Sequence, residues 1–194
     1  MLFPEGVDNM VTYRDRAWGI AVHQHGYITT QDAAAAGIPG IELAKIASRG
    51  RLAHVARGLY RFNELPPTKF SQYYEAVLRL GGDAHLVGDA VLALHDLALV
   101  NPRSIRVGTS KRIRSALPDW ISPQASSERR EDFQLFQLIP CSSVARAIRE
   151  ARPYVIKERL IDSLPKAVYE GLLDEREAQR LEIELKENLY ECTQ

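Results

Sequence analysis

Glycine and proline residues divide the first part of the chain into short segments, and their spacing is the strongest constraint on its fold. They lie at Gly26, Gly37, Pro39, Gly40, Gly50, Gly58 and the pair Pro66-Pro67. Glycine tolerates the positive φ of tight turns and helix ends, and proline interrupts helices and central strands. The spacing therefore predicts a small domain of short elements over residues 1–65.

The first two segments predict helices. Residues 12–25 place apolar side chains at helical spacing before Gly26. Thr29, with Asp32 three residues later, is typical of a capping box that opens a short helix ending at Gly37.

A third helix is predicted over residues 41–49. Leu43 and Ile46 lie on one face of it, as a buried stripe requires. Pro39 suits the first position of this helix, and Gly50 suits its end.

Two short runs with strand character, residues 52–56 and 59–62, follow the third helix. Arg57-Gly58 joins them, and glycine suits a tight hairpin turn. We expect Val55, Tyr60 and Phe62 to face inward and His54, Arg57 and Arg61 to face outward. Three helices followed by a hairpin is the order of elements in a winged helix-turn-helix.

The remainder, residues 66–194, is predicted to be a mainly helical C-terminal domain with a small β-sheet, which makes the fold class α+β. The pattern predicts helices over residues 70–82, 88–102, 142–151, 154–172 and 173–190, with Pro165 kinking or breaking the fourth, and strands over 104–109 and 132–140. Residues 110–132 are polar and rich in turn residues, and their topology stays open.

Charge is distributed unevenly along an electrically neutral chain. The 25 basic residues balance the 25 acidic ones, so composition does not indicate a nucleic-acid-binding protein as a whole. Residues 45–61, however, contain five basic residues and no acidic one, whereas residues 150–194 contain 11 acidic and 7 basic residues. Any contact with nucleic acid must therefore be local.

The basic segment supplies candidate DNA-binding residues. In a helix-turn-helix the third helix enters the major groove, while the wing and the start of the second helix hold phosphates. The candidates are Thr29, Thr30, Gln31, Glu42, Lys45, Ser48, Arg49, Arg51, His54, Arg57 and Arg61. Among them, Glu42 could accept a hydrogen bond from a cytosine amino group. The alternative is an ordinary solvated surface.

The pattern G-Y-I-T-T-x-x-A-A-x-A-G-I, then L-x-x-I-A-x-R-G-R-L-x-x-V-x-R-G-L-Y-R, spans Gly26 to Arg61. It resembles the N-terminal domain of the AbiEi family, the antitoxin half of bacterial abortive-infection (type IV-like) toxin–antitoxin pairs. The segment around His95 resembles the C-terminal region of the same family. The resemblance implies an autorepressor that binds operator DNA through the winged domain. It also implies a cognate nucleotidyltransferase-like toxin, opposed through the C-terminal domain with or without direct contact.

The acidic C-terminal segment offers a candidate toxin-binding surface. Its leucines form an i, i+4, i+8 stripe flanked by glutamates: Leu181, Leu185 and Leu189 with Glu182, Glu184 and Glu187. A toxin that binds nucleic acid or nucleotides should present basic groups, which an acidic helix complements. The alternative is that the leucines pack onto their own domain.

Catalytic and metal-binding patterns are missing from the sequence. The five histidines lack zinc-site spacing, and neither a phosphate-binding glycine loop nor a nucleophile elbow is present. His95 lies in an apolar helical segment, where a core histidine is expected rather than a catalytic one. We therefore expect no catalytic residue, no metal and no cofactor, and we do not expect an enzyme.

Cys141 and Cys192 lack the spacing of a disulfide framework or a metal site, and the chain has no apolar membrane span and no secretory pattern at its start. These features favour a cytoplasmic protein without a membrane partner, and they leave homo-oligomerisation open. Two other functions stay open. One is a winged-helix regulator with a sensory or oligomerising C-terminal domain and no toxin, and the other is a protein adaptor whose wing does not bind DNA.

Overall fold

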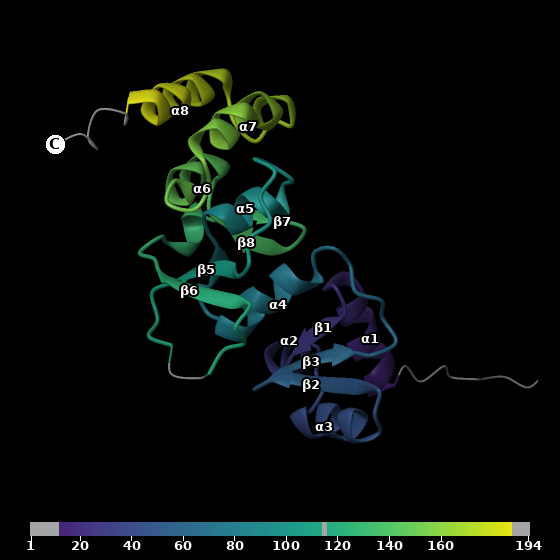
Figure 1. The fold of residues 1–194 in the computed structure, drawn as a ribbon. Coiled ribbons are helices and arrows are strands. Elements are labelled where there is room, and N and C mark those ends of the chain that lie inside the picture. The colour runs from purple at the N-terminus through teal and green to yellow at the C-terminus, as the bar shows by residue number, and fades with distance from the viewer. Residues whose placement is uncertain (1–11, 114–115, 188–194) are drawn as a thin grey trace, which may run out of the picture. The chain divides into compact units, whose positions relative to one another are not determined.

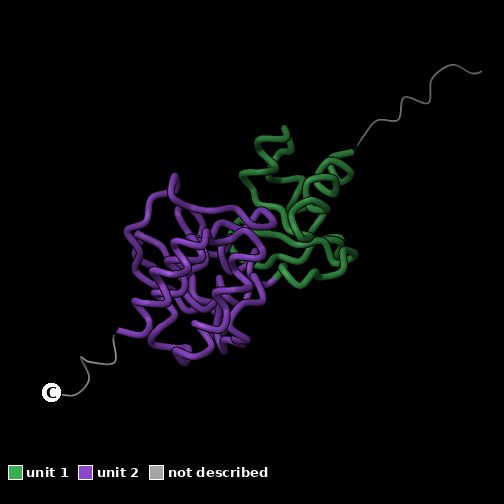
Figure 2. Tube along the Cα trace, turned by 90° about the horizontal axis from the view of Figure 1, so that it is seen from above, with its two compact units in different colours: residues 1–71 green, residues 72–194 purple. Residues whose placement is uncertain are grey.

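A computed structural model of the chain describes residues 12–113 and 116–187 (Figure 1). The chain divides into two compact units, Met1–Ser71 and Gln72–Gln194 (Figure 2). The predicted domain boundary after residue 65 falls within the first unit and stays a prediction. Leu189, Cys192 and the start of the chain, where a secretory signal was considered, lie outside the described residues.

The first unit is a winged helix-turn-helix. Its elements are α1 (Tyr13–His23), β1 (Tyr27–Thr29), α2 (Thr30–Ala35), α3 (Gly40–Ser48), β2 (Leu52–Ala56) and β3 (Leu59–Phe62). The strands form an antiparallel sheet in the order β1-β3-β2. Strand β1, which the sequence did not reveal, pairs with β3 and so ties the hairpin to the start of α2.

A small core holds these elements together. Phe62 of β3 is completely buried, and its ring meets the ring of Trp18 from α1 edge to face at 5.1 Å. Leu43 and Ile46 bury the inner side of α3, as predicted. Burial of a large apolar side chain contributes about 1.5–3 kcal/mol, so these contacts fix the orientation of α3 against the sheet.

Two glycines occupy the turns that shape the third helix and the wing. Gly50 (φ 75°) follows α3, and Gly58 (φ 70°) lies in the β2–β3 turn. The carbonyl of Gly58 accepts a hydrogen bond from the backbone N–H of Thr30 at 2.8 Å. Pro39 is the N-cap of α3 rather than its first residue, because the helix begins at Gly40.

The second unit combines five helices with a mixed five-stranded sheet. The helices are α4 (Ser71–Leu80), α5 (Asp89–Leu94), α6 (Val144–Ala151), α7 (Lys157–Tyr169) and α8 (Glu175–Glu187). The strands are β4 (His85–Leu86), β5 (Ile105–Thr109), β6 (Ile121–Ala125), β7 (Gln134–Phe136) and β8 (Ile139–Cys141), and their order is β6-β5-β4-β8-β7. The predicted α+β class is confirmed.

The structure corrects two local predictions in this unit and defines one segment that the sequence left open. Residues 132–140 form the β7–β8 hairpin instead of one strand, because Gln137 and Leu138 adopt positive φ and reverse the chain. The segment left open contains β6, which pairs in parallel with β5, and a 3-10 turn over Arg130–Asp132. Helix α5 ends at Leu94, since the following loop has positive φ at several residues, although the apolar pattern continues.

Within the described part of the chain, no helix is both long enough and apolar enough to cross a membrane.

Candidate nucleic-acid interface

The start of α2 is fixed by the predicted capping box. The Thr29 hydroxyl accepts a hydrogen bond from the Asp32 backbone N–H at 3.0 Å and donates one to the Asp32 carboxylate at 2.6 Å. The same carboxylate accepts from the Thr29 backbone N–H at 2.8 Å. The side chain of Thr29 is therefore engaged within the unit, while Thr30 and Gln31 are exposed. Phosphate contact by this helix start stays a prediction.

The outer face of α3 combines polar and apolar side chains. Lys45 is exposed and pairs with Glu42 at 2.7 Å, while the Ser48 hydroxyl donates to the Lys45 carbonyl at 2.8 Å. Arg49, the C-cap residue, is exposed, and its side chain makes no hydrogen bond or ion pair with the described residues. The helix therefore carries one paired cation and one unpaired cation on its solvent side.

Two apolar residues on the same face were not among the predicted site residues. Ile41 is 65% exposed, and Ala44 is also exposed, one helical turn further along. Nothing in the packing of the unit requires a large apolar side chain in solvent at this position. The i, i+3 spacing of Ile41 and Ala44 opposite the buried stripe was the signal that could have identified them.

The wing presents a basic turn. Arg57 lies beside Gly58 at the tip, is exposed, and has no polar partner among the described residues. His54 is exposed, with its ring centroid 5.2 Å from that of Tyr60. Arg51, at the base of the wing, pairs with Glu64 at 3.2 Å, and its side chain is 56% exposed.

Arg61 differs from the other candidates because its guanidinium is held inside the unit. It donates to the Leu65 carbonyl at 2.6 Å and the Phe62 carbonyl at 3.4 Å, and it lies over the ring of Tyr27. The residue is only partly exposed. The expectation that Arg61 faces outward is wrong, because β1 supplies the Tyr27 ring on that side of β3. Phe62 is buried and Tyr60 packs partly buried against the same core, as predicted, while Val55 is intermediate in exposure.

The two described leucines of the predicted toxin-binding stripe are buried in their own unit. Leu181 is completely buried and Leu185 nearly so, and α8 packs against α6 and α7. This burial contradicts their assignment to a partner surface, and the alternative interpretation holds. The flanking acids have other positions: Glu184 binds the Arg149 guanidinium at 2.8 and 3.0 Å, Glu182 pairs with Lys186, and Glu187 is exposed.

Two buried histidines of the second unit contact side chains of the same unit. His85 is 1% exposed, and its Nε2 lies 3.2 Å from the Glu128 carboxylate, which also meets Arg146 at 3.4 Å. Burial raises the pKa of Glu128, and the positive charge of Arg146 opposes that rise. His95 packs against Phe136 with ring centroids 4.3 Å apart, and burial lowers its pKa. His95 thus has the core position expected from the sequence.

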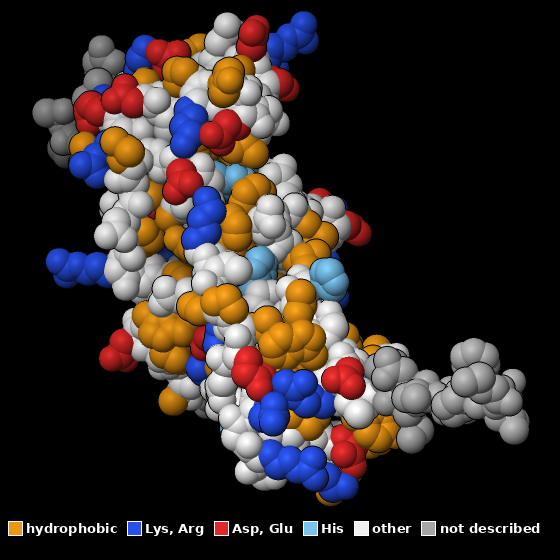
Figure 3. All heavy atoms as spheres, turned by 90° about the vertical axis from the view of Figure 1, so that its right-hand side faces the viewer, with side chains coloured by type: hydrophobic (Ala, Val, Ile, Leu, Met, Phe, Trp, Pro, Cys, Tyr) orange, Lys and Arg blue, Asp and Glu red, His pale blue; other side chains and the backbone are white. Residues whose placement is uncertain are grey.

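On the face shown in Figure 3, basic and acidic side chains are interspersed rather than separated into regions of one sign. Among the described residues, no group of three or more histidine, cysteine, aspartate or glutamate side chains could hold a metal ion. The arrangement in the first unit is that of a rigid helix-and-wing surface, which suits recognition of a binding partner.

Comparison with protein families confirms the resemblance carried by this unit. Residues 20–63 match the family model described as "Transcriptional regulator, AbiEi antitoxin". The match includes α2, α3 and the whole three-stranded sheet. The description is that of a regulator and antitoxin rather than an enzyme class. No curated protein matches the chain significantly.

Proposed function

We propose that this chain, which carries an AbiEi-type antitoxin and transcriptional-regulator domain in residues 20–63, represses its own operon by binding operator DNA and opposes a nucleotidyltransferase-like toxin. The winged helix-turn-helix is assigned to DNA, and the C-terminal unit to the toxin. The DNA assignment is supported by the family description of residues 20–63 and by the surface of α3, and the toxin assignment by the resemblance of the sequence to the AbiEi family.

The observation that carries the DNA proposal is the orientation of α3. Its inner side is anchored by Leu43 and Ile46, so the opposite side points to solvent. That side presents Ile41, Ala44, Lys45 and Ser48 within two turns. A helix of this kind fits the major groove, which is about 12 Å wide.

The residue types suggest distinct contacts within the groove. Lys45 and Arg49 suit phosphates or the acceptor edge of guanine, because both are exposed cations. Ile41 and Ala44 suit the methyl group of thymine, which is the apolar feature of the major groove. The operator is therefore proposed to contain thymines beneath the N-terminal half of α3.

The wing and the start of α2 are assigned to the DNA backbone. Arg57 at the wing tip, together with Arg51 and His54, supplies donors for phosphates or for the minor groove. Thr30 and Gln31 are exposed at the start of α2, where polar side chains suit phosphate contacts. Arg61 is reassigned to a structural role, because its hydrogen bonds and the Tyr27 ring hold it in place.

Salt-dependent operator binding tests this assignment. We expect Arg49→Ala and Arg57→Ala each to weaken binding to DNA from the upstream region of the operon, and to reduce the slope of log affinity against log salt by about 1 if each removes one phosphate contact. Arg129→Ala is the matched control, because Arg129 is an arginine of the second unit with a side chain that is 73% exposed. Unchanged affinity and slope in both wing and helix variants would overturn the proposal.

The substitution Glu42→Gln provides a second test, because the two possible roles of Glu42 predict opposite changes in DNA affinity. If Glu42 only neutralises Lys45 across their 2.7 Å ion pair, Glu42→Gln frees the lysine and tightens binding to all DNA. If Glu42 accepts from a cytosine amino group, the same change weakens operator binding and relaxes preference at one base pair. Competition between operator and scrambled DNA of the same composition distinguishes these results.

The toxin part of the proposal is tested by separating the two roles. The product of the neighbouring gene is expressed with the intact chain or with the Arg49→Ala/Arg57→Ala double variant. We expect the double variant to relieve repression yet still protect cells from the toxin. Protection that is lost together with DNA binding, at equal protein levels, would contradict a separate role of the C-terminal unit.

A further inference from the structure

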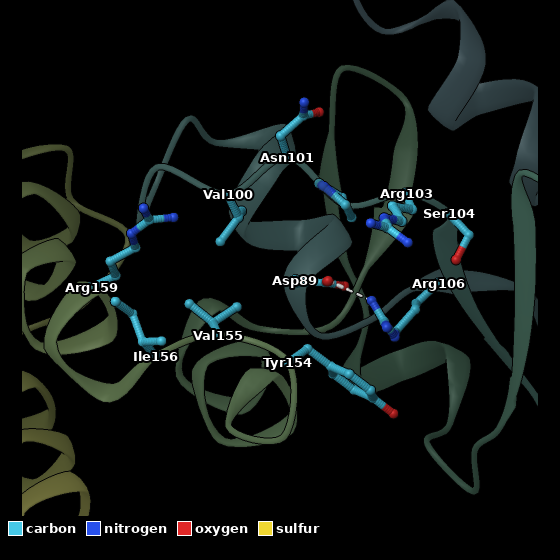
Figure 4. A pocket seen from close by; sticks show the side chains of 11 residues that line it. Asp89, Val100, Asn101, Arg103, Ser104, Arg106, Tyr154, Val155, Ile156 and Arg159 are labelled. Atoms are coloured by element: carbon cyan, nitrogen blue, oxygen red, sulfur yellow. Dashed lines mark hydrogen bonds and ion pairs between the residues drawn. The ribbon is translucent and has the colours of Figure 1, made fainter.

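The second unit contains an arginine-lined cavity that the proposed DNA and toxin roles do not use. Its volume is about 460 Å³, and its walls come from the start of α5, the loop before β5 and β5 itself, the segment that joins α6 to α7, and the start of α7 (Figure 4). Small-molecule sites commonly occupy about 300–1,000 Å³ and combine apolar walls with a few fixed polar groups. This cavity has both features.

Arg106 is held in position on one side of the cavity. Asp89, only 5% exposed, forms an ion pair with it, and the guanidinium carbon lies 3.5 Å from the centroid of the Tyr154 ring. Two buried polar atoms of this cluster, Asp89 Oδ1 and Arg106 Nε, have no hydrogen-bond partner among the described residues. The cluster therefore holds the Arg106 guanidinium in a fixed orientation but leaves these two polar atoms without hydrogen bonds.

The other two arginines frame the cavity at its ends. Figure 4 shows Arg103 on the same side as Arg106, and Arg159 on the opposite side. The Arg103 side chain makes no hydrogen bond or ion pair with the described residues, while the Arg159 side chain donates one hydrogen bond, to the Leu99 carbonyl at 3.3 Å. The charged lining is three arginines and one aspartate, so two positive charges are left uncompensated.

Apolar side chains lie between the two basic ends. Val100 and Val155 line this middle part, and Ile156, which is 60% exposed, lies at the end beside Arg159. A ligand that fits must therefore offer apolar surface between two groups of negative charge. Neither an inorganic anion nor an uncharged apolar molecule satisfies both parts of the lining.

The loop that follows α5 and leads to Val100 has an unusual backbone conformation. Asp96, Ala98 and Leu99 adopt φ values of 54°, 55° and 47°, which non-glycine residues seldom do. Lys166 donates to the Asp96 carbonyl at 2.8 Å, and Arg159 binds the carbonyl of Leu99, so α7 secures the loop. The anchoring keeps Arg159 facing the cavity while leaving its remaining N–H groups available.

We propose that this cavity binds a small organic dianion that carries a carboxylate or phosphate group at each end of an apolar body. One anionic group binds Arg103 and Arg106, and the other binds Arg159. Asp89 is a positioning residue, because it acts on the ligand only through Arg106. Arginine suits such ends because its planar guanidinium forms paired hydrogen bonds with carboxylate or phosphate.

Calorimetric titration of the full-length chain with matched probes tests this site. Suberate and octanoate have similar apolar bodies but two and one carboxylates, and hexane-1,6-diyl bis(methyl phosphate) replaces each carboxylate by a singly charged phosphate diester. We expect at least one of the two dianions to bind about tenfold more tightly than octanoate, which is the effect of one additional charge-assisted contact. The preferred dianion identifies whether the site selects carboxylate or phosphate.

Arginine variants separate specific binding from general attraction of anions. Arg159→Ala should reduce affinity for the preferred dianion about tenfold and leave octanoate nearly unchanged, since only the dianion reaches that end. Arg159→Lys should restore part of the loss. Arg152→Ala is the control, because Arg152 is an exposed arginine close by in sequence that does not line the cavity. Equal binding of dianions and octanoate, or equal losses in the Arg159 and Arg152 alanine variants, would overturn the proposal.

Discussion

Replacement of Gly58 by alanine tests how the wing is built, and Gly50 provides a matched comparison. Both glycines have positive φ, 70° and 75°, in the same unit. A Cβ added at Gly58 would lie 2.9 Å from the Thr30 hydroxyl oxygen, whereas one added at Gly50 meets no described atom within 4 Å. The two substitutions therefore share backbone strain but differ in steric contact.

The two contributions can be estimated separately. The left-handed conformation costs a residue with a Cβ about 1–2 kcal/mol. Crowding of one added carbon typically costs about 1–3 kcal/mol, and the low end applies at Gly58 because Thr30 is exposed and can rotate. We therefore expect Gly50→Ala to lower the free energy of unfolding by about 1–2 kcal/mol, and Gly58→Ala to lower it by about 1 kcal/mol more.

Urea unfolding monitored by tryptophan fluorescence isolates this unit. The chain has two tryptophans, so a Trp120→Phe background leaves Trp18, which packs against Phe62, as the reporter of the first unit. The slope of free energy against urea must stay constant among variants for the comparison to be valid.

A double variant identifies the source of the extra cost. Thr30→Ala removes the hydroxyl that the new Cβ approaches but leaves the Thr30 N–H to Gly58 carbonyl hydrogen bond available. In combination with Gly58→Ala it should recover about 1 kcal/mol relative to the sum of the single effects. Equal costs at Gly50 and Gly58, or additive behaviour of the double variant, would refute the contact assigned between the wing turn and α2.

Three further predictions concern single contacts. Asp32→Ala breaks the capping box of α2 and should cost about 1 kcal/mol by the same fluorescence assay. Leu181→Ala opens a cavity under α8 and should cost the second unit about 2–5 kcal/mol, measured by Trp120 fluorescence in a Trp18→Phe background. The hydrogen bond from Arg149 lowers the pKa of Glu184. The ion pair therefore stabilises the folded chain fully at pH values above the ordinary carboxyl pKa, and this stabilisation is lost as the pH falls through the lowered pKa. Glu184→Gln should therefore be less stable than the intact chain at pH 7 and equal to it in strong acid.

The elements that sequence predicted well are those whose signals are local. Thr29 and Asp32 specify the start of α2 by their own hydrogen bonds, and Gly58 specifies the hairpin turn by its permitted φ. Strand β1 was missed because three residues are too few for alternation to be visible, and it exists through its pairing with β3. The β7–β8 turn was missed because Gln137 and Leu138 are not residues that favour positive φ.

Helix α8 illustrates why an amphipathic pattern cannot distinguish a partner surface from a core. Leu181 and Leu185 have the spacing of a binding stripe, and the same spacing is required to pack a terminal helix onto its own domain. The pairing of Glu184 with Arg149, 35 residues earlier in the chain, is a tertiary contact that no local pattern encodes. The arginines of the cavity are likewise brought together from separate segments of the chain.

Charge alone does not decide which basic residues of the first unit can reach DNA. Lys45 and Arg51 are ion-paired in the structure, but exposed pairs contribute only about 0.2–1 kcal/mol, so a phosphate can displace Glu42 or Glu64 at little cost. Arg61 is withdrawn for a different reason, because leaving its position would break two hydrogen bonds to backbone carbonyls and uncover the Tyr27 ring. The distinction between a weakly paired cation on the surface and one built into the sheet therefore determines which members of a basic segment can bind a partner.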